Sequence, residues 1–380
     1  MTNRELHHLR ALRRDLHGLA ELSGEERATA ARLHEELAAT ELHQKLGGYG
    51  LAACLSGKEP GPTVLLRADM DALPIDEGAS LPYASRTRGT AHKCGHDGHM
   101  TLLVGVFRRF LTDPPARGRL VALFQPAEET GTGARAVIED TAFQVIQPDI
   151  ALAVHNLPGF PLGDVVVKAD TFACASRGLA ARFTGATSHA AEPERGRSPA
   201  LAVAQVIQAW SAARQVYTSL HASVQATVVH ASVGTQAFGT SPGEGAVMAT
   251  LRAPTDKAMS DLGARLEQVA RGIAHAHELE VSFEEHEPFP ATCNDPEVIA
   301  VVERTAHALG FSTTKPTHPF AWSEDFGHFG RVAQAALVGL GAGNEHPALH
   351  NPSYDFPDDL IPIGVKLLES TARHWLGPDD

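Results

Sequence analysis

Residues 63–71 read Thr-Val-Leu-Leu-Arg-Ala-Asp-Met-Asp, an apolar run of strand-forming residues followed at once by two carboxylates. Residues 119–124 and 150–154 are further short apolar runs, and polar residues follow each of them as well. Helical patterns lie between these runs. The alternation of strands and helices predicts an α/β fold with a largely parallel sheet and helices on both of its faces.

Two helical patterns flank the first of these strands. The pattern before it starts near Ser23, which has the spacing of a helix capping box with Glu26. The pattern after it covers residues 100–111 and follows a polar stretch at residues 92–99. We therefore expect the stretch at 92–99 to be a loop that leads into a helix.

The middle of the chain follows a different order. Between residues 178 and 284 the patterns run strand, helix, strand, strand, helix, strand, which is the order of the ferredoxin-like unit. Because this set is complete, we expect a separate domain inserted into the first one. The predicted boundaries are residues 1–173 for the first part of the α/β domain, 174–286 for the inserted domain and 287–380 for the second part of the α/β domain.

The composition is that of a globular protein with an acidic surface: 380 residues, 43% hydrophobic and 20% charged, with a net charge of −13. Such a surface repels phosphate backbones and anionic lipids, so we expect no nucleic-acid partner and no membrane partner. No apolar run reaches the roughly 18 residues that a spanning helix needs, and no signal peptide is evident. Four widely spaced cysteines suit a reducing compartment, so we expect a cytoplasmic protein.

Metal-binding side chains gather in residues 92–99, which read His-Lys-Cys-Gly-His-Asp-Gly-His. An isolated Asp-x-Asp, a Glu-Glu pair or a single histidine after a strand is more often structural. Because ligands bind beyond the carboxyl ends of parallel strands, however, all these groups are expected at one edge of the sheet. Together they can hold two divalent ions, for which zinc, manganese, cobalt and nickel are candidates.

Three stretches resemble one known family: Leu-Arg-Ala-Asp-Met-Asp-Ala-Leu-Pro-Ile at 66–75, Cys-Gly-His-Asp-Gly-His at 94–99 and Phe-Gln-Pro-Ala-Glu-Glu at 124–129. This family is a metal-dependent amidohydrolase branch of the aminoacylase and carboxypeptidase clan. It includes hippurate hydrolases, N-acyl-amino-acid amidohydrolases and auxin-conjugate hydrolases. Shorter matches near both ends keep the same order, so the resemblance covers nearly the whole chain.

The resemblance implies a role for each site residue. Glu128 is expected to be the general base. Asp71 is expected to orient a metal ligand without binding the metal itself. The cofactors implied are two divalent cations, with one thiolate bridging them. The five implied metal ligands are Cys94, His96, Glu129, His155 and His350.

The inserted domain resembles a lid that also forms a dimer. In this family the histidine at the position of His189 reaches the active site of a neighbouring subunit and stabilises the oxyanion. Arg252 matches an arginine that binds the substrate carboxylate, and the resemblance implies a homodimer or a larger homo-oligomer. Two positions depart from the family pattern: Gly239 replaces a lid asparagine, and Lys93 replaces the small residue before the site cysteine.

The expected reaction is hydrolysis of the amide bond of an N-acyl amino acid, or of a similar dipeptide-like substrate, by metal-activated water. A dipeptidase or carboxypeptidase of the same clan, and a metal-binding relative that has lost its activity, remain as alternatives. A cysteine hydrolase that uses Cys94 and His96 is a third alternative. A nucleophile and its base are normally far apart in sequence, which disfavours this last one.

Overall fold

The computed structural model describes residues 1–37, 41–78, 80–219 and 223–377. The chain divides into two compact units, each with its own hydrophobic core. The first unit comprises Met1–Phe172, Thr292–Pro319 and Glu324–Asp380, and the second comprises Ala173–Ala291 and Phe320–Ser323.

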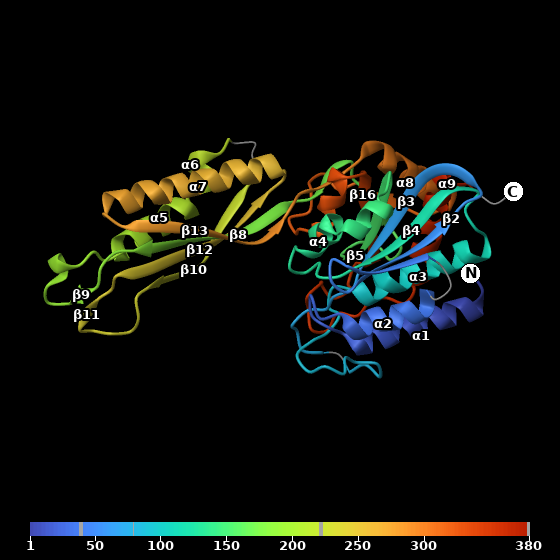
Figure 1. The fold of residues 1–380 in the computed structure, drawn as a ribbon, viewed down its shortest axis with the longest axis horizontal. Helices are drawn as coiled ribbons and strands as arrows, with labels where there is room; N and C mark the ends of the chain where they lie inside the picture. Colours follow the sequence, from blue (N-terminus) through green and yellow to red (C-terminus); the bar gives the residue numbers. More distant parts are fainter. Residues whose placement is uncertain (38–40, 79, 220–222, 378–380) are drawn as a thin grey trace. The chain divides into compact units, whose positions relative to one another are not determined.

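The first unit is built on an eight-stranded sheet (Figure 1). Its strands are Glu41–Leu46 (β1), Gly50–Ser56 (β2), Glu59–Asp69 (β3), Arg117–Gln125 (β4), Ile150–Pro158 (β5), Val165–Val166 (β6), Thr313–Thr314 (β15) and Gln334–Gly343 (β16). Their order in the sheet is β1-β2-β4-β3-β5-β16-β6-β15. The four central strands, β4, β3, β5 and β16, pair in parallel, which confirms the predicted α/β fold class. The sequence patterns do not indicate the antiparallel hairpin of β1 and β2, because β1 is rich in polar residues.

Helices lie on both faces of this sheet. They are Asn3–Leu19 (α1), Arg27–Leu37 (α2), His96–Thr112 (α3), Gly133–Glu139 (α4), Pro296–Ala308 (α8) and Leu360–Leu376 (α9), with short 3-10 turns at Thr141–Val145 (η1) and Asp325–Arg331 (η3). Val64 and Leu66 of β3 pack in the same core as residues of α1, α3 and α9. Arg67 points to the opposite face, because side chains alternate along a strand, and there it bonds to Asp325 of η3.

The register of the parallel strands brings their carboxyl ends to one level. Asp69 of β3 pairs with Gln125 of β4, and Arg67 of β3 pairs with Ala153 of β5. His155 follows Ala153 by the same two residues that separate Asp69 from Arg67. The polar groups at the ends of these three strands therefore start from the same edge of the sheet, where α/β proteins bind ligands.

Helix α3 begins earlier than its apolar pattern predicts, at His96 rather than at Met100. Gly95 precedes it with φ 93°, a left-handed conformation that favours glycine. A Cβ atom at Gly95 would also lie 2.3 Å from Oδ1 of Asn156. His96 and His99 therefore lie in the first turn of a helix and not in the expected loop, so their backbone is held by the helix.

The second unit is an antiparallel sheet with helices on one face. In chain order its main elements are Ala175–Thr184 (β8), Ala200–Ser211 (α5), Ala213–Tyr217 (α6), Gln225–Val233 (β10), Glu244–Ala253 (β12), Asp256–Ala276 (α7) and Glu280–Phe289 (β13). The strand order β10-β12-β8-β13 is that of a ferredoxin-like unit. Figure 1 shows α5 and α7 on the same side of this sheet. Between them, the buried Trp210 donates its Nε1–H to the carbonyl oxygen of Leu266 at 3.1 Å.

Short pairs of strands complete the described residues. Ser188–His189 (β9) and Thr240–Ser241 (β11) form a two-stranded ribbon in the second unit, close to a 3-10 turn at Pro193–Arg195 (η2). Asp170–Ala173 (β7) pairs with Thr292–Asn294 (β14). The ribbon matters below because it carries His189.

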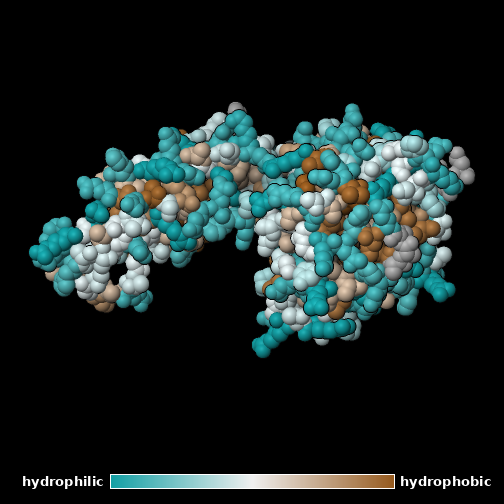
Figure 2. Space-filling view, viewed as in Figure 1, coloured by the Kyte–Doolittle hydropathy of each residue, from teal (hydrophilic) through white to brown (hydrophobic). Residues whose placement is uncertain are grey.

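The surface is mostly hydrophilic, as Figure 2 shows for one face of the molecule. Some large apolar side chains of the second unit are nevertheless strongly exposed, among them those of Leu201, Val216, Val229 and Phe238. Within the described part of the chain, every helix is too short or too polar to cross a membrane.

Two helical glycines allow a test of how tightly α3 is packed. A Cβ atom at Gly98 would lie 2.2 Å from the ring of the buried Phe356, whereas a Cβ at Gly272 of α7 meets nothing within 4 Å. We expect Gly98→Ala to destabilise the protein by about 1–3 kcal/mol, because overpacking outweighs the better helix propensity of alanine. Gly272→Ala, the matched control, is expected to stabilise it by about 0.5–1 kcal/mol. Urea unfolding of both variants measures the two effects, and a Gly98→Ala variant as stable as Gly272→Ala would contradict the packing.

Candidate metal centre

The five side chains expected to bind metal converge beyond the carboxyl ends of β3, β4 and β5. The sulfur of Cys94 and the ring nitrogens of His96 and His155 lie within 4.8 Å of one another. The same sulfur forms a second triad of this size with a carboxylate oxygen of Glu129 and a ring nitrogen of His350. Cys94 thus belongs to both triads, which is the arrangement that a thiolate shared by two cations requires.

Hydrogen bonds orient two of the imidazoles toward the sulfur. Nδ1 of His96 lies 2.9 Å from the carbonyl oxygen of Asp71, and Nδ1 of His155 lies 2.9 Å from the carbonyl oxygen of Asn156. Each Nδ1 must donate to its carbonyl, so when the ring is neutral, as it is when a metal is bound, Nε2 is the nitrogen with a lone pair. Nε2 of His155 lies 3.5 Å from the sulfur of Cys94.

Two buried polar atoms of the expected ligands lack hydrogen-bond partners among the described residues. They are Nε2 of His96 and Oε1 of Glu129, which lie 3.8 Å apart. Buried polar atoms are normally satisfied, so the absence of partners at these two atoms needs an explanation. A divalent cation that accepts nitrogen, oxygen and sulfur ligands would satisfy both atoms, and the donor set of the two triads fits such ions.

Asp71 holds two of these ligands in place. Its Oδ2 accepts hydrogen bonds from Oγ of Ser23 at 2.6 Å and from the backbone N–H of Glu129 at 2.9 Å. Its carbonyl oxygen takes the Nδ1–H of His96. Ser23 therefore serves the site and does not cap α2, which begins at Arg27.

Glu26 supports the turn that precedes the glutamate pair. Its buried carboxylate oxygen Oε1 accepts the backbone N–H of Ala127 at 2.8 Å and that of Gly24 at 2.9 Å. Ala127 has φ 53°, a left-handed conformation that is uncommon for a residue with a side chain. Like Ser23, Glu26 is thus used at the site and not in a capping box.

Glu128 is buried against η3. Its Oε1 accepts the backbone N–H of Asp325 at 3.4 Å. Burial raises the pKa of Glu128 well above the ordinary value for glutamate, and the nearby carboxylates of Glu324 and Glu129 raise it further. In this position Glu128 can take up a proton readily.

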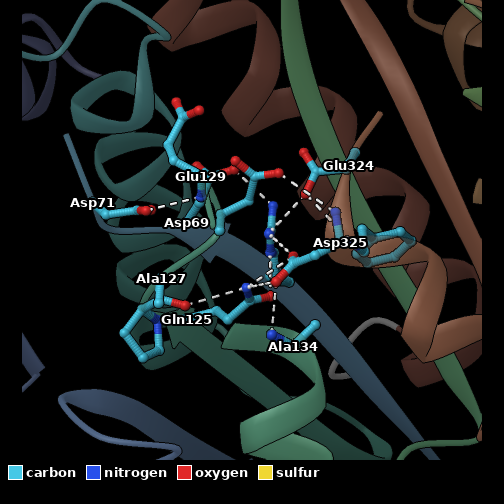
Figure 3. Close-up of polar contacts among 12 residues, drawn as sticks. Asp69, Asp71, Gln125, Ala127, Glu129, Ala134, Glu324 and Asp325 are labelled. Atoms are coloured by element: carbon cyan, nitrogen blue, oxygen red, sulfur yellow. Dashed lines mark hydrogen bonds and ion pairs between the residues drawn. The ribbon is translucent and has the colours of Figure 1, made fainter. Parts of the chain in front are cut away.

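Asp325 connects the end of β4 to the start of α4, as Figure 3 shows. Its carboxylate accepts hydrogen bonds from Nε2 of Gln125 at 2.9 Å, from the backbone N–H of Ala134 at 2.8 Å and from Nη2 of Arg67 at 2.9 Å. The Glu129 carboxylate points away from this cluster. The two neighbouring glutamates are therefore anchored in different surroundings.

Burial has the largest effect on the pKa values of Cys94, His155 and Glu129, whereas Asp69 raises the pKa of His96 well above its usual value against the effect of burial. Burial raises the pKa of the Cys94 thiol, and it lowers the pKa of His155 to about 3, so that His155 is neutral at neutral pH. The pKa of Glu129 is raised to about 7, chiefly by burial. A neutral imidazole is the form that binds metal, and a bound divalent cation deprotonates a coordinating thiol.

The sequence did not predict a network of buried polar side chains next to the ligands, which we call the polar frame; it is centred on Arg67, Asp69 and His99. Arg67 donates to Asp69 at 2.6 Å and to Glu324 at 2.9 Å, in addition to its bond with Asp325. His99 lies 2.6 Å from Asp69 and 2.6 Å from Oδ1 of Asn156, so both of its ring nitrogens are already engaged. The signal was present in the sequence, since an arginine within an apolar strand must find buried partners.

The remaining predicted residues lie in the second unit. His189 is exposed on the β9–β11 ribbon, where its Nδ1 accepts the backbone N–H of Ala191 at 3.1 Å. Nη1 of Arg252 on β12 donates to the carbonyl oxygen of Ala321 at 2.7 Å and to Oγ of Ser323 at 3.3 Å. A Cβ atom at Gly239 would meet nothing within 4 Å, so the backbone leaves room for a larger residue there.

Comparisons with known proteins show the family to which the chain belongs. Residues 65–374 match the profile of Peptidase family M20/M25/M40. An N-acetyl-L-cysteine deacetylase from Bacillus subtilis is 29% identical over 97% of this chain and 88% of its own length. A hippurate hydrolase from Campylobacter jejuni is 30% identical over 96% of both chains. A solved Bacillus subtilis structure, described as a dinuclear metal-binding peptidase from the M20 family, superimposes with a TM-score of 0.84 at 25% identity and 98% coverage of both chains.

The profile covers most of the chain, and the hippurate hydrolase aligns with it nearly from end to end. The chain is therefore a hydrolase that belongs to peptidase family M20/M25/M40.

Proposed function

We propose that this hydrolase cleaves the amide bond of N-acyl amino acids with a pair of divalent cations. The observation that carries the proposal is the pair of triads that share the sulfur of Cys94, with Glu128 directly beside the ligand Glu129. The similarity to a deacetylase and to a hippurate hydrolase supports an acylated amino acid as substrate. The expected ligands are Cys94, His96, Glu129, His155 and His350.

The cations would supply the nucleophile, because a bound divalent metal lowers the pKa of water from 15.7 to about 7 and polarises a carbonyl. Glu128 accepts the proton of this water and passes it to the leaving amine. Asp71 holds both ligands in place during the reaction. Its carbonyl oxygen bonds to the ring of His96, and its carboxylate bonds to the backbone N–H of Glu129. The two neighbouring glutamates thus have different roles: Glu128 is the base and Glu129 is a metal ligand.

The second unit would contribute to substrate binding. We assign to His189 the stabilisation of the oxyanion, in the active site of a second copy of the chain, and to Arg252 the substrate carboxylate. The exposed position of His189 on its ribbon suits a contact outside its own unit. The protein would accordingly act as a homodimer. A thiolate ligand also suits a reducing compartment, so we place the reaction in the cytoplasm.

The electrostatics of the site disfavour the cysteine-hydrolase alternative. A cysteine nucleophile reacts as thiolate, usually beside an imidazolium. Asp69 raises the pKa of His96, the partner in this alternative, against the effect of burial. Burial and the carboxylate of Glu129 nevertheless raise the pKa of the Cys94 thiol, although His96 opposes them. Cys94 therefore lacks the activation that a nucleophile needs, whereas its position between two triads suits a metal ligand.

A substrate panel tests the proposed function. N-acetyl and N-benzoyl amino acids, their C-terminal amides and simple dipeptides are offered to the enzyme with zinc or manganese, and bound metal is counted in the same preparation. We expect hydrolysis of the acyl amino acids, loss of activity on exhaustive chelation and recovery on adding cations. Activity that survives chelation would point to the cysteine hydrolase, cleavage of dipeptides alone to a dipeptidase, and two bound ions without any turnover to an inactive relative.

The base assignment predicts the effect of Glu128→Gln. Glutamine keeps the size of the side chain but cannot take up a proton, so kcat should fall by about 10²–10⁴-fold. The metal content should stay at two ions per chain, because Glu128 is not one of the expected ligands. Steady-state kinetics and elemental analysis check both parts, and near-normal turnover would refute the role of Glu128.

Mixing two inactive variants tests the role of His189 across subunits. His189→Ala and Glu128→Gln should each have low activity as pure proteins. When the two are mixed under conditions that exchange subunits, hybrid dimers contain one site with both intact residues, and part of the wild-type activity should return. An assay that finds no recovery, although native mass spectrometry detects hybrid dimers, would place His189 in its own subunit's site or outside catalysis.

A further inference from the structure

Lys93 stands directly before Cys94 and its side chain is completely buried. Lysine is almost never fully buried without a partner. Its Nζ donates to the carbonyl oxygen of Tyr354 at 2.8 Å and forms an ion pair with the carboxylate of Glu77.

The loop that carries His350 depends on the same lysine. The backbone N–H of His350 donates to the carbonyl oxygen of Lys93 at 2.8 Å. Lys93 therefore holds this loop twice, through its main chain at His350 and through its side chain at Tyr354. Glu77 extends the support, because its second oxygen lies 2.9 Å from Nε2 of the buried His17.

His350 needs such support more than the other expected ligands do. It has φ 63°, a strained backbone conformation for a residue with a side chain, and strain of this kind persists only where the surroundings hold it. Its side chain is 52% exposed, and its ring nitrogen lies 3.8 Å from Oε2 of Glu129. His96 and His155, by contrast, belong to a helix and a strand, and each is fixed by a hydrogen bond at Nδ1.

We propose that Lys93 is a positioning residue that sets the geometry of His350 and thereby the affinity of the cation held by Cys94, Glu129 and His350. The cation held by Cys94, His96 and His155 does not depend on the lysine side chain. This inference rests on the proposed function, since it presumes the two cations. It assigns to a single buried side chain the control of one of them.

Titration of the metal-free protein with zinc tests the inference without any substrate. Lys93→Met removes both side-chain contacts while keeping the length of the side chain. We expect one of the two dissociation constants to rise by about 10–100-fold, the usual effect of losing a residue that supports a metal ligand, and the other to stay unchanged. Lys366→Met, at an exposed position on α9, is the matched control and should leave both constants unchanged.

A second variant guards against loss of folding. Lys93→Met strands the carboxylate of Glu77, which lies partly buried, so the single variant can fail to fold. The double variant Glu77→Gln with Lys93→Met leaves no unpaired charge, and its glutamine can still bond to His17. The circular dichroism of the metal-free protein establishes folding, and the same selective loss of one zinc ion is expected.

Combination with His350→Ala identifies the route of the effect. If Lys93 acts through His350, the constants of Lys93→Met with His350→Ala should equal those of His350→Ala alone. Combination with His155→Ala should instead be additive. Unchanged constants in Lys93→Met, equal weakening of both ions, or additivity with His350→Ala would each overturn the inference.

The two proposals fail in different ways. A wild-type protein that binds two zinc ions but hydrolyses no acyl amino acid would refute the proposed function and leave the role of Lys93 standing. A Lys93→Met variant with normal zinc constants would refute only the role of Lys93. A wild-type protein that binds fewer than two ions would overturn both.

Discussion

The parallel pairing of β3 with both β4 and β5 is the constraint on which the site depends. It sets Asp69 opposite Gln125 and carries His155 to the same edge of the sheet. Because the strands are buried on both faces, the sheet fixes where each chain segment leaves it. Asp71, Glu128 and Glu129 come only a few residues after these strands. The short turns that carry them are therefore enough to place them beside the histidines.

Collecting so many acidic groups in a buried place is costly, and Arg67 offsets much of this cost. Its guanidinium bonds to Asp69, Glu324 and Asp325 from the centre of the sheet. One guanidinium offsets only part of the charge of three carboxylates, and burial still raises the pKa of Asp325 to about 8. Glu128 and Glu129 are left less compensated, which is why burial raises their pKa values, and two cations would complete the balance at that position.

The sequence predicted the strands that end at the site, and the resemblance implied the five expected ligands, of which Cys94, His96 and Glu129 stand in short contiguous motifs. It did not reveal the start of α3 at His96, since the apolar pattern of the helix begins only later. It also misread Ser23 and Glu26 as a capping box, although their partners are Asp71 and Ala127. Such contacts join residues far apart in the chain, and local spacing carries no information about them.

Two strained residues flank the site, and each is held by a group that is itself buried. Ala127, with φ 53°, precedes the glutamate pair and is fixed by the carboxylate of Glu26, while His350, with φ 63°, is fixed by the carbonyl of Lys93. Strain of this kind costs about 1–3 kcal/mol at each residue. Glycine would relieve it but would also free the backbone just where a base and a ligand must stay in place. The fold therefore gives up some stability to keep the site rigid, and the contacts that hold the strained residues come from the buried carboxylate of Glu26 and the main chain of Lys93.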